Sequence, residues 1–153
     1  MKNDSSKKLA VVEDKEENVL AQMGKQFVFS RSFSSKEMKT FAELTGDNNP
    51  IHQSEEFAKQ SIFKQRIVPG VLLMSMFSKI FGTLPDNSGI YEFQSCQFIK
   101  PVYLDETVKA IVELSSVDKI KNVGTFSTKC FKGQDELVLL GEAKVKFQKK
   151  KFN

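Results

Sequence analysis

The sequence contains no tryptophan and only one histidine and two cysteines among its 153 residues. Cys96 and Cys130 form no CxxC pair and show no metal-ligand spacing, which argues against a structural zinc site. We expect both to behave as small buried hydrophobic side chains in a reducing compartment. The lone histidine, His52, is therefore the only imidazole available for chemistry.

Long apolar runs are also missing, since none reaches the ~18 residues that a membrane-spanning helix needs. The N-terminal segment has no apolar signal core, carries acidic residues between Glu13 and Glu17, and has no arginine before Arg31. These features argue against a signal peptide and a typical mitochondrial transit peptide. The final Lys-Phe-Asn is not a peroxisomal address. We expect a cytoplasmic protein, or a mitochondrial matrix protein if the source is eukaryotic.

The net charge of +4 is a mild excess and is carried mostly by lysine. Such a charge permits an anionic, phosphate-bearing ligand, but no motif typical of nucleic-acid binding is present. The length predicts one compact domain. We expect a flexible polar arm over residues 1–22, a single domain over 23–148 and a basic tail over 149–153.

The first half of the domain combines one strand with several helices. Alternating phenylalanines predict a strand over Gln26–Phe33. Ser34 and Glu37 fit a capping box, which starts a helix whose apolar face contains Met38, Phe41, Ala42 and Leu44. Gly46 ends that helix, and Ser54 is placed to cap a further short one.

A second helix, from Gly70 to Gly82, is apolar on nearly all sides, which predicts a buried central helix. Strands are predicted at 90–100, 106–117, 123–131 and 137–147. The order is one strand, then helices, then an antiparallel meander. This α+β pattern predicts a curved sheet of about five strands around the helix. Because one sheet covers only part of an apolar helix, we also expect at least a homodimer.

The segment Gly46-Asp47-Asn48-Asn49-Pro50-Ile51-His52 brings together residues that suit acid–base chemistry. A carboxylate and an imidazole held close together can activate a water molecule. The Gly70 N–H, at a helix start, could stabilise a developing oxyanion. The alternative is structural: Asp47 as a turn residue bonded to its own backbone, and His52 as a packed side chain.

This segment and the helix after it resemble the hot-dog fold and, in detail, the MaoC-like (R)-specific enoyl-CoA hydratases, or hydratase 2. The likeness runs from about residue 24 to residue 147. It rests on the pattern Gly-Asp-x-Asn-Pro-x-His at Gly46–His52, on Phe57-Ala58 and on Arg66-Ile67-Val68. The sequence departs from the pattern at Pro69-Gly70, where the family usually has His-Gly. The related acyl-carrier-protein dehydratases have Pro-Gly there.

The resemblance implies reversible addition of water to trans-2-enoyl thioesters, giving (R)-3-hydroxyacyl thioesters, in fatty acid metabolism. Asp47 and His52 would carry the catalysis, and the backbone N–H of Gly70 would bind the thioester carbonyl. Ser78 would help to order the catalytic side chains. No metal or redox cofactor is implied, and coenzyme A or acyl carrier protein would carry the acyl group.

Two alternatives remain within this fold. A hot-dog thioesterase would bind the same thioesters but release the thiol, and the order of residues 46–52 favours the hydratase. A non-catalytic acyl-thioester binding module is disfavoured by the presence of both Asp47 and His52. For the carrier phosphates, Lys64 and Arg66 are candidate contacts, with a solvated loop tip as the alternative.

Overall fold

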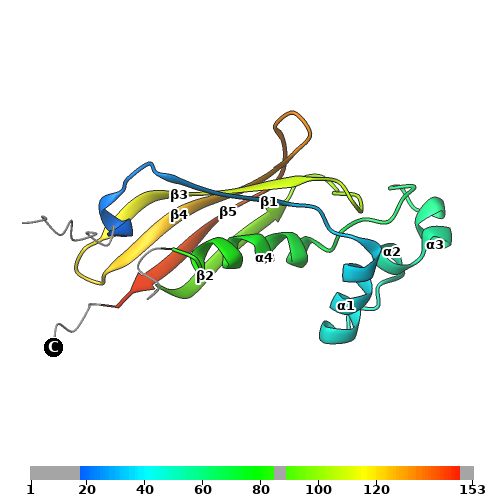
Figure 1. Cartoon of the computed structure of the whole chain (residues 1–153), viewed down its shortest axis with the longest axis horizontal. Helices are drawn as coiled ribbons and strands as arrows, with labels where there is room; N and C mark the ends of the chain where they lie inside the picture. The colour runs from blue at the N-terminus through cyan, green and yellow to red at the C-terminus, as the bar shows by residue number, and fades with distance from the viewer. Residues whose placement is uncertain (1–17, 85–88, 149–153) are drawn as a thin grey trace, which may run out of the picture.

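The computed structural model describes residues 18–84 and 89–148. One curved antiparallel sheet of five strands forms the body, and a single long helix, α4, lies along one of its faces (Figure 1). Three shorter helices gather beyond one end of α4. The elements, in chain order, are η1 (Val19–Ala21), β1 (Gln26–Arg31), α1 (Ser35–Thr45), α2 (Pro50–Gln53), α3 (Glu55–Gln60), α4 (Gly70–Phe81), β2 (Gly89–Phe98), β3 (Val108–Asp118), β4 (Val123–Lys132) and β5 (Glu136–Phe147).

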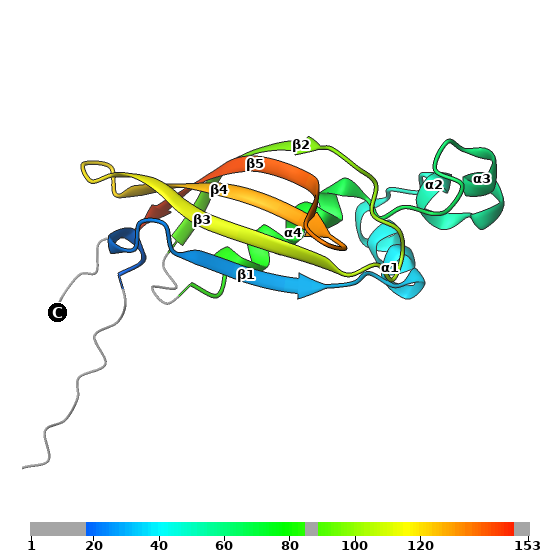
Figure 2. The same cartoon turned by 90° about the horizontal axis from the view of Figure 1, so that it is seen from above.

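The strands lie in the order β1-β3-β4-β5-β2, which Figure 2 shows from above. The α+β class and the five-stranded curved sheet are as predicted, but the simple meander is wrong. Strands β3, β4 and β5 follow one another through hairpins. Strand β2 pairs with β5, so the connection from β2 to β3 crosses from one side of the sheet to the other. A tight turn makes two consecutive strands neighbours in the sheet. The longer segment 99–107, which joins β2 to β3, does not require these two strands to pair.

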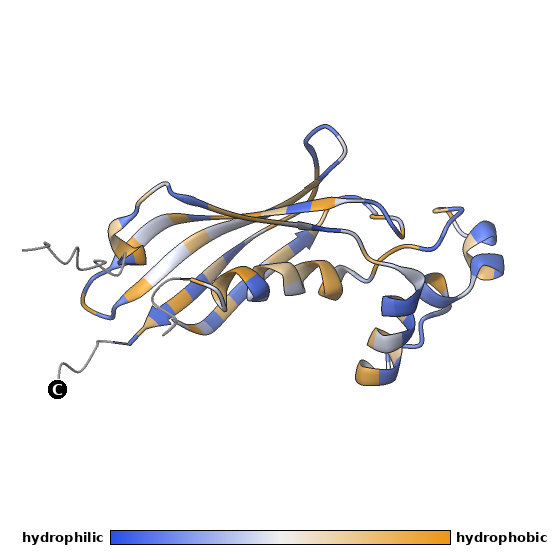
Figure 3. Ribbon diagram, in the orientation of Figure 1, coloured by the Kyte–Doolittle hydropathy of each residue, from blue (hydrophilic) through white to orange (hydrophobic). Residues whose placement is uncertain are grey.

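The core lies between α4 and the sheet. Strand β3 alternates as predicted, with Val108, Ala110, Val112 and Leu114 all buried. Helix α4 contributes Leu73, Met76, Phe77, Ile80 and Phe81 from its inner face. The hydropathy colouring in Figure 3 shows how apolar the helix is along most of its length.

In one subunit, α4 is covered only in part, as expected for an apolar helix that lies against a single sheet. Val71 is 53% exposed, and Ser75, Ser78 and Lys79 face outward with it. The apolar pattern predicted that one sheet would leave part of this helix open, but it did not show which face. This subunit alone therefore presents an uncovered stripe on α4.

The domain begins earlier than residue 23. Val19 is fully buried in the core, and Leu20 packs over Gly124, where a Cβ would lie only 2.9 Å from Leu20 Cδ2. Removal of these two apolar side chains from water favours packing of this segment against the sheet. Residues 1–17, which make up the rest of the predicted arm, and the predicted basic tail 149–153 lie outside the described residues.

Helix α1 starts with the predicted capping box. Ser34 Oγ accepts from the Glu37 N–H, and the Glu37 carboxylate accepts from the Ser34 N–H at 2.8 Å. Met38 and Ala42 are buried beneath it, but Leu44 is 82% exposed, so its assignment to the apolar face was wrong. Leu44 falls near the end of the helix, where the chain turns away from the core.

Both cysteines are free thiols. Burial raises the pKa of Cys130 to about 12, so its side chain stays an uncharged thiol at neutral pH. Within the ranges 18–84 and 89–148, no helix combines the length and the apolar character required to cross a membrane.

Candidate active site

The turn that carries Asp47 is built by local hydrogen bonds. Gly46 adopts a left-handed conformation with φ of 78° and ends α1, as glycine does readily. Asp47 Oδ1 then accepts from the Asn49 N–H at 3.1 Å, and Asn49 Oδ1 accepts from the Ile51 N–H at 3.2 Å. Pro50 begins α2 with its φ already suited to a helix. These two side-chain turns fix the path of the chain into His52.

His52 is 9% exposed, and within the described residues its imidazole has one hydrogen bond, between Nδ1 and the carbonyl oxygen of Ile67 at 2.7 Å. A carbonyl oxygen can only accept, so Nδ1 carries the proton and donates it. In the neutral imidazole the other nitrogen, Nε2, then has a free lone pair. The contact therefore fixes both the ring orientation and the nitrogen that is available as a base.

The Ile67 carbonyl is itself held by a short backbone ladder. Ile67 forms an isolated antiparallel bridge with Tyr103, and the Val68 N–H donates to the Val102 carbonyl at 2.8 Å. The chain then passes through Pro69 and enters α4 at Gly70. One rigid segment thus positions the acceptor for His52 and the first turn of α4.

The first N–H of α4 belongs to Gly70, and no intrahelical carbonyl is available to it. Within the described residues, this N–H makes no hydrogen bond. The ring of Phe98 packs against Gly70 so closely that an added Cβ would lie 2.4 Å from its Cε1. Only glycine fits this position without a shift of Phe98.

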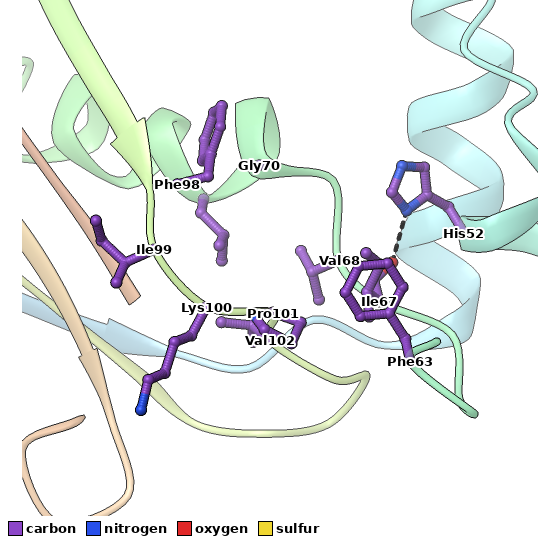
Figure 4. A pocket seen from close by; sticks show the side chains of 11 residues that line it. His52, Phe63, Ile67, Val68, Gly70, Phe98, Ile99, Lys100, Pro101 and Val102 are labelled. Atoms are coloured by element: carbon purple, nitrogen blue, oxygen red, sulfur yellow. Dashed lines mark hydrogen bonds between the residues drawn. The ribbon is translucent and has the colours of Figure 1, made fainter. Parts of the chain in front are cut away.

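His52 and Gly70 share one cavity of about 310 Å³ (Figure 4). Figure 4 shows His52 on one side and Phe98 with the start of α4 on the other. The lining is mostly apolar, which suits an acyl chain. The full lining is His52, Phe63, Ile67, Val68, Gly70, Leu73, Phe98, Ile99, Lys100, Pro101 and Val102.

Two of the four predicted site residues lie elsewhere. Asp47 is half-buried in the turn before His52 but does not line the cavity, and its carboxylate accepts the turn bond from the Asn49 N–H. Ser78 lies on the exposed side of α4, about 12 Å along the helix axis from Gly70. The structure thus brings His52 and Gly70 together, while the roles of Asp47 and Ser78 stay predictions.

Sequence reasoning missed two parts of the site. The Ile67 carbonyl is a backbone atom, and its contact with His52 gives no side-chain signal. Phe98 was included only in a predicted strand, and nothing in the sequence indicated its contact with Gly70. Both contacts join segments distant in the chain, which spacing alone does not reveal.

Comparison with known proteins places the chain in a family. A MaoC-like domain matches residues 18–132. The mitochondrial 3-hydroxyacyl-[acyl-carrier-protein] dehydratase of Arabidopsis thaliana is 39% identical over 118 residues, which cover 74% of this chain and 70% of that protein. The (R)-specific enoyl-CoA hydratase of Aeromonas caviae is 36% identical over 126 residues, which cover 82% of this chain and 94% of that protein.

Solved structures agree with this placement. The (R)-hydratase from Aeromonas caviae superposes with a TM-score of 0.79 at 36% identity, covering 83% of this chain and 97% of that one. An R-hydratase from Pseudomonas aeruginosa gives a TM-score of 0.78 at 28% identity, covering 84% of this chain and 83% of that one. The chain therefore has the hot-dog fold and belongs to the MaoC-like family.

Proposed function

We propose that the protein is an (R)-specific enoyl-thioester hydratase, a hydro-lyase that adds water reversibly to trans-2-enoyl thioesters and gives (R)-3-hydroxyacyl thioesters. The observation that carries this proposal is the shared cavity of His52 and Gly70, in which Nδ1 is fixed by the Ile67 carbonyl at 2.7 Å and Nε2 is left as the base. The enzymes named as hydratases and dehydratases among the relatives support the reaction class.

The proposed reaction begins when the thioester carbonyl accepts from the Gly70 N–H. His52 Nε2 takes one proton from water as the water oxygen bonds to C3 of the substrate. The C2=C3 π electrons move toward the thioester oxygen, and the resulting negative charge is stabilised by the Gly70 N–H. The imidazolium then returns the proton to C2, so one water molecule is consumed and His52 is regenerated.

Asp47 is the second member of the proposed pair. It lies in the turn that leads directly into His52, and its carboxylate would orient the water and stabilise the imidazolium. Its bond to Asn49 uses Oδ1, which leaves the second carboxylate oxygen for that role. Ser78 would act only on the ordering of this pair. No metal or redox group takes part in these steps.

The test is a hydration assay with crotonyl, octenoyl and dodecenoyl thioesters, each on coenzyme A and on acyl carrier protein. We expect consumption of the enoyl thioester with formation of the (R)-3-hydroxy product, checked by chiral analysis. Free thiol is measured in the same reactions. Thiol release without hydration would instead identify a thioesterase. If neither product forms, the protein is a non-catalytic binding module.

The carrier is proposed to be a phosphopantetheine thioester whose phosphates meet basic side chains at the cavity mouth. Of the two candidates, Arg66 already binds Glu55 at 2.7 Å and Ser35 at 3.0 Å, which offsets its charge. Lys64 is exposed and is the better candidate. If N-acetylcysteamine thioesters turn over as efficiently as coenzyme A esters at every salt concentration, phosphate contacts are unimportant.

A homodimer is proposed as the working assembly. Strand β2 is an edge of the sheet, and it exposes the large apolar side chains of Ile90, Phe93 and Phe98. Natural proteins seldom leave such an edge uncovered. A second copy pairing along β2 would cover it and would bring the partner close to Phe98, which lines the cavity.

The proposed compartment is the cytoplasm, with the mitochondrial matrix as the alternative for a eukaryotic source. Two free cysteines are compatible with either reducing compartment. Fluorescence localisation of the full-length chain in its source organism distinguishes the two.

A further inference from the structure

A buried lysine lies behind the candidate site. Lys132, at the end of β4, is only 9% exposed. Its Nζ donates to the Pro101 carbonyl at 2.7 Å and lies 3.4 Å from Glu106 Oε2 and 3.8 Å from Glu136 Oε2. It also lies 5.1 Å from the centre of the Tyr103 ring. Burying a cation is costly unless it is paired, so these contacts define one orientation for the ammonium group.

Three of these four contacts, those to Pro101, Tyr103 and Glu106, converge on the segment 101–106. Pro101 is held through its carbonyl, and Tyr103 is held through its ring and through its N–H, which donates to Glu106 Oε2 at 3.0 Å. Glu106 Oε2 is therefore shared by the Tyr103 N–H and the Lys132 ammonium. Lys132 thus fastens this segment to the end of β4.

The same segment forms the backbone ladder beneath the site. Val102 accepts the Val68 N–H at 2.8 Å, and Tyr103 is bridged to Ile67. Ile67 in turn accepts from His52 Nδ1. Pro101 and Val102 also line the cavity directly. A displacement at Pro101 would therefore reach His52 and Gly70 through two adjacent backbone contacts.

We propose that Lys132 is a positioning residue for the hydration reaction: its ammonium group fixes the segment 101–103, and through it the Ile67 carbonyl that orients His52. Lys132 itself does not line the cavity and touches no reacting atom. Groups aligned for the transition state lose much of their effect when moved by about 1 Å. The inference rests on the proposed function.

The test compares Lys132→Met with Lys132→Arg, which keeps a cation able to donate to Pro101. Lys109→Met is the matched control, because Lys109 pairs with Asp135 at 2.8 Å on the same end of the sheet but has a side chain that is 42% exposed. We expect Lys132→Met to lower kcat on the order of 10–100-fold with a smaller change in KM. Lys132→Arg should recover most of the loss, and the control should match the wild type.

A second readout does not depend on activity. His52 is the only histidine, so ring-labelled protein gives one set of imidazole nitrogen signals in NMR. The Nδ1 signal should shift in Lys132→Met and stay unchanged in Lys109→Met. Failure of the proposed function would appear as an inactive wild type, while this signal would still test the link from Lys132 to His52.

Removal of one partner could leave Glu106 unpaired and unfold the protein. The double variant Lys132→Met with Glu106→Gln removes both charges and keeps an acceptor for the Tyr103 N–H, so it serves as the second test. A folded Lys132→Met or double variant with wild-type kcat and an unchanged imidazole signal overturns the proposal. A lower Tm with unchanged kcat per folded molecule does the same, because it assigns Lys132 to stability alone.

Discussion

His52 has one nitrogen committed to the Ile67 carbonyl and one left for chemistry, so substitutions at this residue can separate the two. His52→Gln and Asp47→Asn should each lower hydration by roughly 10²–10⁴-fold, the usual worth of a positioned acid–base group. His52→Asn separates the two roles more clearly, because its amide can still donate to the Ile67 carbonyl while the proposed base, Nε2, is lost. Single-turnover rates on crotonyl-CoA measure the effect.

Thermal melts of the same variants are the control. Both residues lie outside the strands and α4, so we expect folded proteins. The double variant should lose much less than the product of the two single losses, since both act on the same water. If Asp47 only forms the turn, Asp47→Asn would lose stability while turnover per folded molecule stayed near wild type.

Gly70 offers a second residue-scale test. An added Cβ would lie 2.4 Å from the Phe98 ring, so Gly70→Ala must move that ring or the start of α4. We expect a loss of kcat/KM even though the N–H is retained, because the oxyanion contact depends on position. Adding Phe98→Ala should restore part of the loss by making room. No recovery in the double variant would show that the strain lies in the helix backbone instead.

At the scale of elements, the capping box of α1 predicts a pH-dependent stability. The Ser34 N–H, which bonds the Glu37 carboxylate, holds the pKa of Glu37 below its ordinary value of 4.5, with further help from Ser34 Oγ and Arg31. Because the folded pKa is the lower one, the contribution is complete above about pH 4.5 and is lost as pH falls through the folded value.

Urea unfolding of Glu37→Gln at neutral pH and at about pH 3 measures this contribution. The variant should be less stable than the wild type at neutral pH, and the difference should shrink in acid. Ser34→Ala, which removes the side-chain half of the box, should cost about 1 kcal/mol at neutral pH. A difference that stays constant between the two pH values would contradict the role of the Glu37 charge.

Local signals explain why the element boundaries were predictable. Ser34 and Glu37 determine the start of α1, Gly46 its end, and Gly70 and Gly82 the limits of α4, all through contacts within a few residues. The pairing of β2 with β5 was not predictable in this way, since it depends on packing between distant segments. The exposure of Leu44 was missed for the same reason.

In the whole molecule, too, the parts of the site that depend on neighbouring residues were predictable, and those that depend on distant segments were not. The turn holding Asp47 and the helix start at Gly70 could be found from sequence, because each is a short motif. The contact from His52 to Ile67, the Phe98 wall and the anchoring of Pro101 by Lys132 all join separate segments. Only the fold brings them together, and two of the three use backbone atoms that any residue would supply.

Assembly is the prediction that belongs to the whole molecule. The apolar edge β2 calls for a second copy, which could also cover Val71 on the open face of α4. We expect sedimentation to show a dimer at micromolar concentration. Ile90→Glu combined with Phe93→Glu should dissociate it, because two buried charges would face the partner's edge.

The matched control is Ile120→Glu, which changes the same kind of residue at the exposed hairpin between β3 and β4. It should leave the dimer intact. Since Phe98 lies on β2 and lines the cavity, dissociation should also lower hydration per subunit. A wild type that sediments as a stable, active monomer would contradict the assembly. A charged-edge variant that stays dimeric would place the interface elsewhere, with the stripe on α4 as the remaining candidate.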